Sequence, residues 1–118
     1  MPFDPRPFVA HHRAEAEAER KAIQERAALA LEEAHRIAKS IESGDPAVRR
    51  VILFGSLAEA GPRRLDFDID LCLDGGDLYR AMDAADDSPF EVDIVRLDLL
   101  PQHVREHIQT RGRPLAGR

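Results

Sequence analysis

Apolar side chains between residues 8 and 43 recur at steps of three and four, which is the period of an amphipathic helix. The segment is rich in Ala, Glu and Arg, which all favour helix. We therefore predict one long helix over residues 8–43, stopped by Gly44-Asp45-Pro46. Its apolar seam is Ile23, Ala27, Ala30, Ala34, Ile37 and Ile41.

The early part of this helix, residues 11–20, has alanines among charged residues and no long apolar seam. It is expected to project from the body of the protein. Two interpretations remain open for it. It is either a solvated helix laced with ion pairs, or a contact surface for a partner or a second copy of the chain, which would make a homo-oligomer through this helix.

The period changes to two in the second half of the chain. An apolar run over residues 48–54 predicts a strand that ends at Gly55-Ser56, and residues 65–73 then alternate strictly. Side chains alternate between the faces of a strand, so Phe67, Ile69 and Leu71 should enter a core. Asp66, Asp68 and Asp70 would line the opposite face, and residues 90–97 form a third strand.

Short helices fill the remaining segments. Residues 56–60 read as the opening turn of a short helix, and Asp77 can cap a helix over residues 78–85. Asp98 is expected to cap a last helix over residues 99–110, which Gly112 and Pro114 end. This order predicts an α+β fold, with a small mixed β-sheet and helices packed on one side. One domain would span residues 1–118, with a helical segment at 1–43 and a core at 48–115.

Composition narrows the functional classes. The chain has 118 residues, 43% of them hydrophobic and 33% charged, and no apolar stretch as long as a membrane span. Its single cysteine, Cys72, excludes an internal disulfide and reads as a small buried hydrophobe, and residues 1–12 lack the order of a signal peptide. A reducing cytoplasm is therefore expected. The net charge of −5 disfavours a long nucleic acid as partner, but not a nucleotide.

Closely spaced carboxylates mark the candidate site. Asp66, Asp68 and Asp70 stand two residues apart, about 6.5–7 Å along a strand. Like charges at this spacing raise one another's pKa unless a cation compensates, and Mg²⁺ prefers carboxylates together with substrate phosphates. The alternative is a solvated edge strand whose charges oppose aggregation.

The combination of Gly55-Ser56 after an apolar strand with Asp68-x-Asp70 within a dozen residues resembles the nucleotidyltransferase superfamily, which has the DNA polymerase beta-like fold. The similarity is to its minimal nucleotidyltransferases and covers residues 48–115. The resemblance implies that Asp68 and Asp70 bind two Mg²⁺ ions, with Mn²⁺ as a substitute. It also implies that Asp93 binds the ion that activates the acceptor hydroxyl, with Glu91 as a rival.

The resemblance further implies that Gly55 and Ser56 hold the phosphates of ATP or another nucleoside triphosphate. One departure concerns the arginines that relatives often carry just after the serine, where this chain has Leu57 and Glu59. Arg63 or Arg64 either compensates from the following loop or is a solvated loop charge. The departure bears on catalytic efficiency more than on the fold.

A second motif, His103-Val104-Arg105-Glu106-His107, matches the order of one class of zinc peptidase. The residues after His107 include no further metal ligand, so partly exposed helix histidines are the favoured interpretation.

Two functions follow from the resemblance. In the first, the chain transfers AMP from ATP to an acceptor hydroxyl on a partner toxin of the HEPN type, and so acts as an antitoxin. In the second, it keeps the fold but neutralises its partner by contact alone. The intact Asp68, Asp70 and Asp93 favour the enzyme, and Leu57 and Glu59 favour the binding module.

Overall fold

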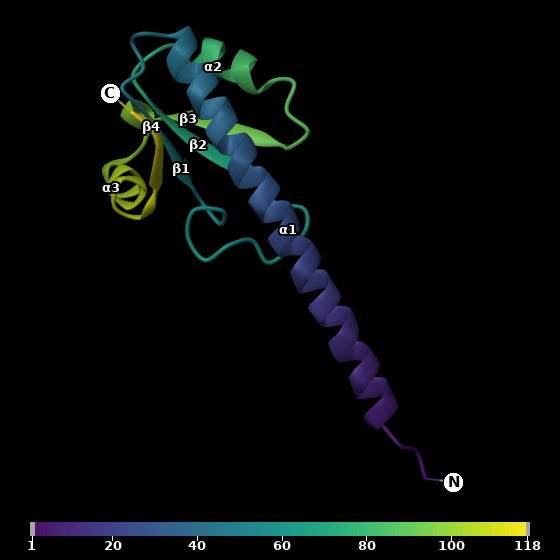
Figure 1. The fold of residues 1–118 in the computed structure, drawn as a ribbon. Helices are drawn as coiled ribbons and strands as arrows, with labels where there is room; N and C mark the ends of the chain where they lie inside the picture. Colours follow the sequence, from purple (N-terminus) through teal and green to yellow (C-terminus); the bar gives the residue numbers. More distant parts are fainter. Residues whose placement is uncertain (1, 118) are drawn as a thin grey trace.

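The computed structural model describes residues 2–117, and its longest element is the helix α1, Arg6–Gly44 (Figure 1). The helix stops because Asp45 adopts an extended backbone, with φ −145° and ψ 104°. Its buried residues follow the seam predicted from the sequence: Ile23, Ala30, Ala34, Ile37, Ala38 and Ile41. No helix within residues 2–117 is both long enough and apolar enough to cross a membrane.

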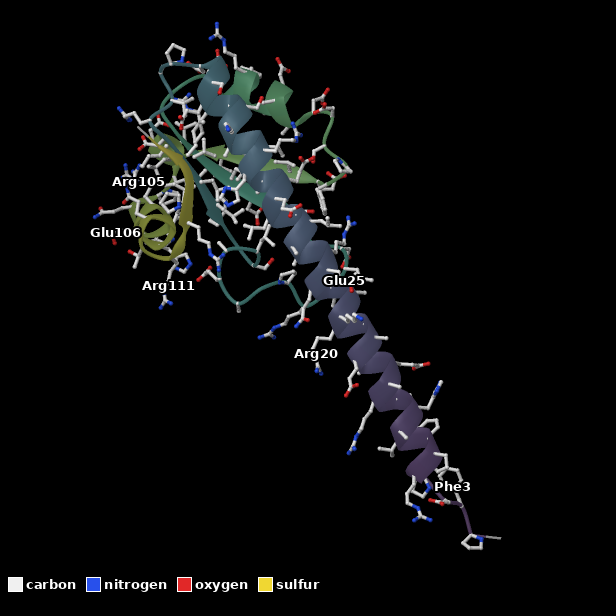
Figure 2. The ribbon with its side chains drawn as sticks, viewed as in Figure 1. Phe3, Arg20, Glu25, Arg105, Glu106 and Arg111 are labelled. Atoms are coloured by element: carbon white, nitrogen blue, oxygen red, sulfur yellow. The ribbon has the colours of Figure 1, made fainter. Side chains whose placement is uncertain are left out.

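The first half of α1 extends beyond the rest of the molecule as an arm (Figures 1 and 2). Ile23 is its first buried residue, and the side chains from Arg6 to Lys21 are exposed. Arg20 projects from the part of the arm nearest the body and lines a hollow with residues 60–63 (Figure 2). The arm therefore adds little apolar burial to the fold.

Removing residues 1–20 should leave a protein that unfolds cooperatively with little change in melting temperature, because the buried seam starts at Ile23. Thermal unfolding followed by circular dichroism measures this. A matched truncation of residues 1–30 also removes Ile23, Ala27 and Ala30, and should lower the melting temperature clearly. A non-cooperative transition in the shorter truncation would show that the arm belongs to the core.

A four-stranded sheet with the order β3-β2-β1-β4 forms the body. Its strands are β1 (Arg50–Phe54), β2 (Ile69–Asp74), β3 (Val92–Arg96) and β4 (Arg113–Gly117). β1 is antiparallel to β2 and β4, whereas β2 and β3 are parallel and are joined through the helix α2, Leu78–Ala85. The mixed sheet, the long first helix and the α+β class are as predicted.

Helices cover both faces of this sheet. Side chains such as Val51, Leu53 and Leu71 pack with α1 and α2 on one face. On the other face, Ile52 and Cys72 pack with Ile108 of the helix α3, Gln102–Arg111. The prediction that helices lie on one side is thus correct for α1 and α2 and wrong for α3. The physical reason is that the central strands are apolar at consecutive positions, so both faces need cover.

Three local predictions were wrong at element boundaries. β2 begins at Ile69 and not at Leu65, because its neighbours start there: Phe54, the last residue of β1, pairs with Asp70, and Val92 pairs with Ile69. Asp66 therefore lies in a loop and not on a strand face. The third strand is also shorter than predicted, and residues 56–60 form hydrogen-bonded turns rather than a helix.

The C-terminal part differs in two further ways. The last helix begins at Gln102, because Pro101 favours an extended conformation in Leu100, and Asp98 pairs with Arg96 instead of capping the helix. Beyond Gly112 the chain forms β4, which the sequence did not predict. Pro114 lies within β4, where an edge strand tolerates a missing donor. The predicted cap of α2 is confirmed, since Asp77 accepts from Tyr79 N at 2.8 Å.

Candidate functional site

The sheet brings two of the predicted carboxylates side by side. Asp70 of β2 and Asp93 of β3 are partners in the parallel register, so their Cα atoms lie about 4.8 Å apart. Both side chains alternate with residues that pack under α1 and α2, which places them on the α3 side of the sheet. Asp68 stands just before β2 and is exposed.

The electrostatics show that these carboxylates interact. Burial, followed by the charges of Asp93 and Asp68, raises the pKa of Asp70 to about 6. No basic side chain offsets this rise, so Asp70 gives up its proton less readily than an ordinary aspartate and its charge is uncompensated at neutral pH. A cation bound beside these three groups would relieve the repulsion.

The turn at Gly55-Ser56 lies directly against Asp70. Phe54 is the register partner of Asp70, and the next residue, Gly55, has a φ of +76°. A Cβ at Gly55 would lie only 2.4 Å from Asp70 Oδ2. The backbone then closes a turn in which Ala58 N and Glu59 N donate to Gly55 O at 3.1 and 3.2 Å. Glycine is needed here both for the positive φ and for the room that the carboxylate occupies.

Gly55→Ala should therefore destabilise the protein by about 1–2 kcal/mol and also displace the Asp70 carboxylate. The matched control is Gly75→Ala, because Gly75 has a similar φ of +80° and its added Cβ would lie 2.6 Å from Ala47 O, beyond the end of β2 that is away from the cleft. Chemical denaturation and calorimetric titration with Mg²⁺–ATP measure the two effects. Both variants should lose stability, and only Gly55→Ala should lose nucleotide binding. Equal binding by the two variants would contradict the role of the Gly55–Asp70 contact.

A cleft of about 630 Å³ opens beside the carboxylates. Ser56, Asp68 and Asp70 line it, together with Arg63 and Arg64 of the loop between β1 and β2. The structure thus brings Ser56 and the Asp68-x-Asp70 pair to one cleft. Gly55 and Asp93 adjoin Asp70 but are not among the residues that line the cleft.

The two departures from the resemblance have structural explanations. Leu57 is buried in the core beneath α1, so this position does not reach the cleft. Glu59 lines the cleft, where His107 of α3 lies 3.2 Å from its carboxylate. Arg64 pairs with Asp66 at 3.2 Å, and both line the cleft. Arg63 and Arg64 are therefore the positive charges of this cleft.

Metal binding can be judged from the donors present. Asp68, Asp70 and Asp93 offer only carboxylate oxygens, the donor set that Mg²⁺ prefers, and the raised pKa of Asp70 shows that positive charge would be stabilising there. Within residues 2–117, however, no three His, Cys, Asp or Glu side chains are gathered as closely as a bound ion requires. The three residues therefore offer suitable donor atoms from neighbouring strands. To surround an ion, their side chains would have to rotate toward one another.

The same finding bears on the rival residues. His103 and His107, like the three aspartates, belong to no such group in the described chain, so this finding does not decide between the two motifs. Glu91 lies just before β3, and its backbone carbonyl accepts from Ile69 N at 2.9 Å. Register places Asp93, and not Glu91, beside Asp70, although the assignment of Asp93 as a ligand stays a prediction.

Arg26 of α1 is a contributor that sequence reasoning missed. Its Nε donates to Leu65 O at 3.2 Å, and its guanidinium lies 4.6 Å from the ring centre of Phe90 and 5.9 Å from that of Phe67. These contacts fix the segment that leads into Asp68. No sequence signal links residues 39 positions apart, so only the tertiary structure could show this.

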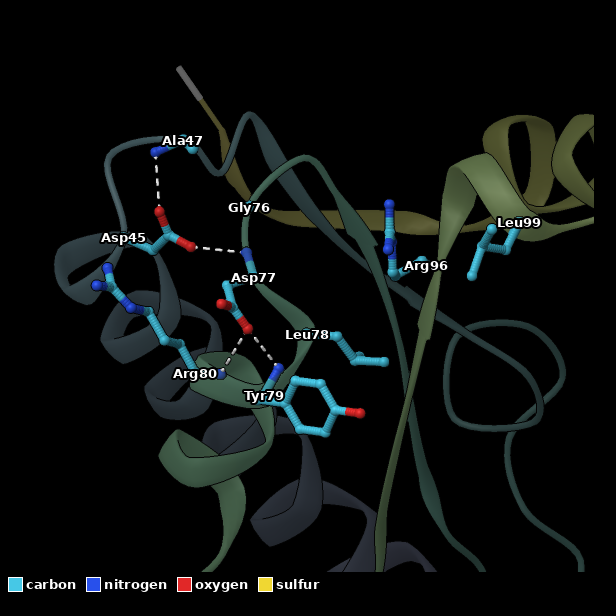
Figure 3. Close-up of a pocket in the computed structure, with 9 residues that line it drawn as sticks. All are labelled: Asp45, Ala47, Gly76, Asp77, Leu78, Tyr79, Arg80, Arg96 and Leu99. Carbon is cyan, nitrogen blue, oxygen red and sulfur yellow. Dashed lines mark hydrogen bonds between the residues drawn. The ribbon is translucent and has the colours of Figure 1, made fainter.

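A second hollow, of about 670 Å³, lies beyond the C-terminal end of β2 (Figure 3). Its acidic side chains accept hydrogen bonds from backbone N–H groups. The Asp45 carboxylate accepts from Ala47 N and Asp77 N, and the Asp77 carboxylate accepts from Tyr79 N and Arg80 N. They hold the turn before α2 in place. Because Asp70 lies near the other end of β2, this hollow is separate from the carboxylate cleft.

Comparison with known proteins supports the fold. No protein-family model and no curated protein matches the sequence. Among solved structures, the chain is similar to a chain in a mutant of the toxin–antitoxin pair MntA–HpeT and to one in a toxin–antitoxin complex with AMP-PNP. The TM-score is 0.59 for both, with 22% and 24% identity, over 72% of this chain and 73% of theirs.

A third similar structure is the tri-AMPylated Shewanella oneidensis HEPN toxin in complex with an MNT antitoxin. Here the TM-score is 0.53 and the identity 23%, over 72% of this chain and 70% of the other. At these identities the likeness concerns the fold. The chain therefore has an α+β nucleotidyltransferase fold, as the sequence resemblance implied.

Proposed function

We propose that this chain is a metal-dependent nucleotidyltransferase that moves AMP from ATP to a hydroxyl group of a partner protein. The observation that carries the proposal is Asp70, whose pKa is raised by burial and by two neighbouring carboxylates at the mouth of an open cleft. Functional sites are where such uncompensated charges collect. The fold and the Gly55 turn beside Asp70 support the same conclusion.

The chain's residues would divide the work as follows. Asp68, Asp70 and Asp93 would hold Mg²⁺ or Mn²⁺, which supplies charge stabilisation at the phosphates. The Gly55-Ser56 turn, with Arg63 or Arg64, would hold the triphosphate in the cleft. The acceptor oxygen forms a bond to the α-phosphorus, the bond from that phosphorus to the bridging oxygen breaks, and pyrophosphate leaves. Asp93 would orient the acceptor hydroxyl, and its proton passes to Asp93 or to solvent.

We infer the partner from the similar structures, which are toxin–antitoxin complexes, one of them with an AMPylated HEPN toxin. The cleft beside Asp70 is open, so an acceptor carried on a second protein can reach it. On this proposal the chain is an antitoxin that inactivates a toxin of that kind by adenylylating it.

Intact mass spectrometry of a co-expressed partner tests the proposal. After incubation with ATP and Mg²⁺, the partner should gain the mass of one or more AMP units. The matched control is α,β-methylene ATP, in which the bond that must break is not available. A partner that is neutralised with no change of mass would contradict the enzyme.

That outcome would favour the second candidate, an antitoxin acting by contact alone. Two observations support it: Leu57 is buried where relatives often have an arginine, and Glu59 places a negative charge in the cleft. Calorimetry of ATP binding in the presence of Mg²⁺ or Mn²⁺ separates the two candidates, because only the enzyme requires the nucleotide.

A further inference from the structure

β3 is an edge strand that presents free backbone groups. Within residues 2–117 it pairs with β2 on one side and with no strand on the other. Ile69 N donates to Glu91 O, and the bonds of a parallel pair repeat every two residues, so Asp93 and Val95 also direct their backbone groups toward β2. Val92 and Ile94 therefore direct their N–H and C=O groups away from the sheet.

A groove of about 380 Å³ follows this edge, between β3 and α2. Phe90, Val92 and Ile94 form its apolar floor, and Tyr79 and Met82 of α2 rise beside it with 77% and 49% of their surfaces exposed. Edge strands are usually blunted by lysine, proline or a covering segment. β3 contains neither lysine nor proline, and its one basic residue, Arg96, stands at the end of the strand and pairs with Asp98 at 2.6 Å, so the middle of the edge is open to pairing.

The charge of the groove selects among possible occupants. Asp83, Asp86 and Glu91 line it, and no lysine or arginine does. An occupant that carries basic side chains would gain from all three carboxylates, and an acidic one would be repelled.

The edge also carries a residue of the candidate site. Asp93 stands in the middle of β3, with its side chain on the face opposite the groove. In an added strand, successive side chains would alternate between the groove and the face of Asp93. A side chain directly opposite Asp93 would have its Cβ about 4.5–5.5 Å away.

We propose that a basic, extended segment of a partner protein adds as a strand to the free edge of β3. Its apolar side chains occupy the groove beneath α2, and a hydroxyl-bearing side chain between them lies beside Asp93. The evidence for docking is the free edge of β3 and the groove beside it. The use of that hydroxyl as acceptor rests on the proposed function.

A labelled synthetic peptide, Lys-Gln-Val-Tyr-Val-Gln-Lys, is the probe, because its lysines and valines share the face that meets the groove while its tyrosine lies on the face of Asp93. Its binding to the full chain is measured by fluorescence anisotropy without nucleotide. The matched peptide with glutamate in place of lysine should bind at least about tenfold more weakly. Methylating single backbone nitrogens of the probe should weaken binding about fivefold to tenfold at alternate positions only, because alternate residues donate to β3. Equal binding of both peptides, or no alternation, would overturn the proposal.

Protein variants locate the contact. Val92→Pro removes an outward N–H without removing a hydrogen bond to β2, so it should keep the fold and weaken binding about tenfold or more. Asp83→Lys should weaken binding as well, while Glu17→Lys, on the exposed arm of α1, should not. If Val92→Pro and Asp83→Lys bind the peptide as the parent does, or if β3 edges instead pair two copies into a dimer, the proposal is wrong. Docking without any transfer would contradict only the proposed function.

Discussion

Asp93→Asn is expected to reduce nucleotidyl transfer by about 10²–10⁴-fold while ATP affinity stays within a few-fold. The reason is its place in the sheet. Asp93 lies beside Asp70 in register but does not line the cleft that would receive the triphosphate. Asparagine has the same shape and removes the charge that would activate the acceptor hydroxyl. The measurement pairs the mass of the co-expressed partner with calorimetric titration of ATP.

Glu91→Gln is the matched control for Asp93→Asn, because it also removes one carboxylate charge next to β3. The Glu91 variant should transfer AMP within a few-fold of the parent. If it loses transfer but still binds the basic peptide as the parent does, Glu91 is the third carboxylate, whereas loss of both would place Glu91 in the docking groove. If the Asp93 variant loses ATP binding as strongly as transfer, Asp93 belongs to the nucleotide site and not to the acceptor site.

Asp70→Asn is expected to abolish metal-dependent ATP binding and, at the same time, to stabilise the metal-free protein at neutral pH. Asp70 lies in the cleft beside two like charges, and its partial burial and these charges make its ionisation unfavourable. Asparagine removes that unfavourable charge but leaves too few oxygens to hold a cation. Asp68→Asn should also lose binding. Mg²⁺–ATP binding by both variants at the parent's affinity would contradict the site.

The pH dependence of stability tests the same carboxylate. The pKa of Asp70 is raised from 3.8 to about 6, so between these values the folded state holds a proton that the unfolded state releases. The free energy of unfolding therefore falls as pH rises from about 4 to 6, and the loss is complete above pH 6. The expected loss is about 1–2 kcal/mol after allowance for solvent screening.

Other carboxylates titrate in the same range, so the informative quantity is the stability of the parent minus that of Asp70→Asn, measured by urea unfolding without metal. This difference should become less favourable to the parent between pH 4 and pH 6, and saturating Mg²⁺ should reverse the trend. A difference that does not change with pH would show that burial and the neighbouring carboxylates do not raise the pKa of Asp70.

Much of this molecule follows from the sequence by itself. The steps of three and four from Ile23 to Ile41 predicted the buried seam of α1, and the lack of such a seam before Ile23 predicted the arm. The alternation around Asp70 assigned β2 and its two faces, and Asp77 predicted the cap of α2. These signals are local, because helix periodicity, strand alternation and capping each depend on residues only a few positions apart.

The features that could not be predicted from the sequence depend on contacts between residues that are distant along the chain. β2 starts at Ile69 because its neighbouring strands start there, and β4 forms because β1 offers it an open edge. α3 lies on the second face because that face is apolar and would otherwise be uncovered. The sequence predicted Asp68, Asp70 and Asp93 as site residues. Only the strand register showed that Asp93 lies beside Asp70, and only the close approach at Gly55 showed that the turn lies against the Asp70 carboxylate.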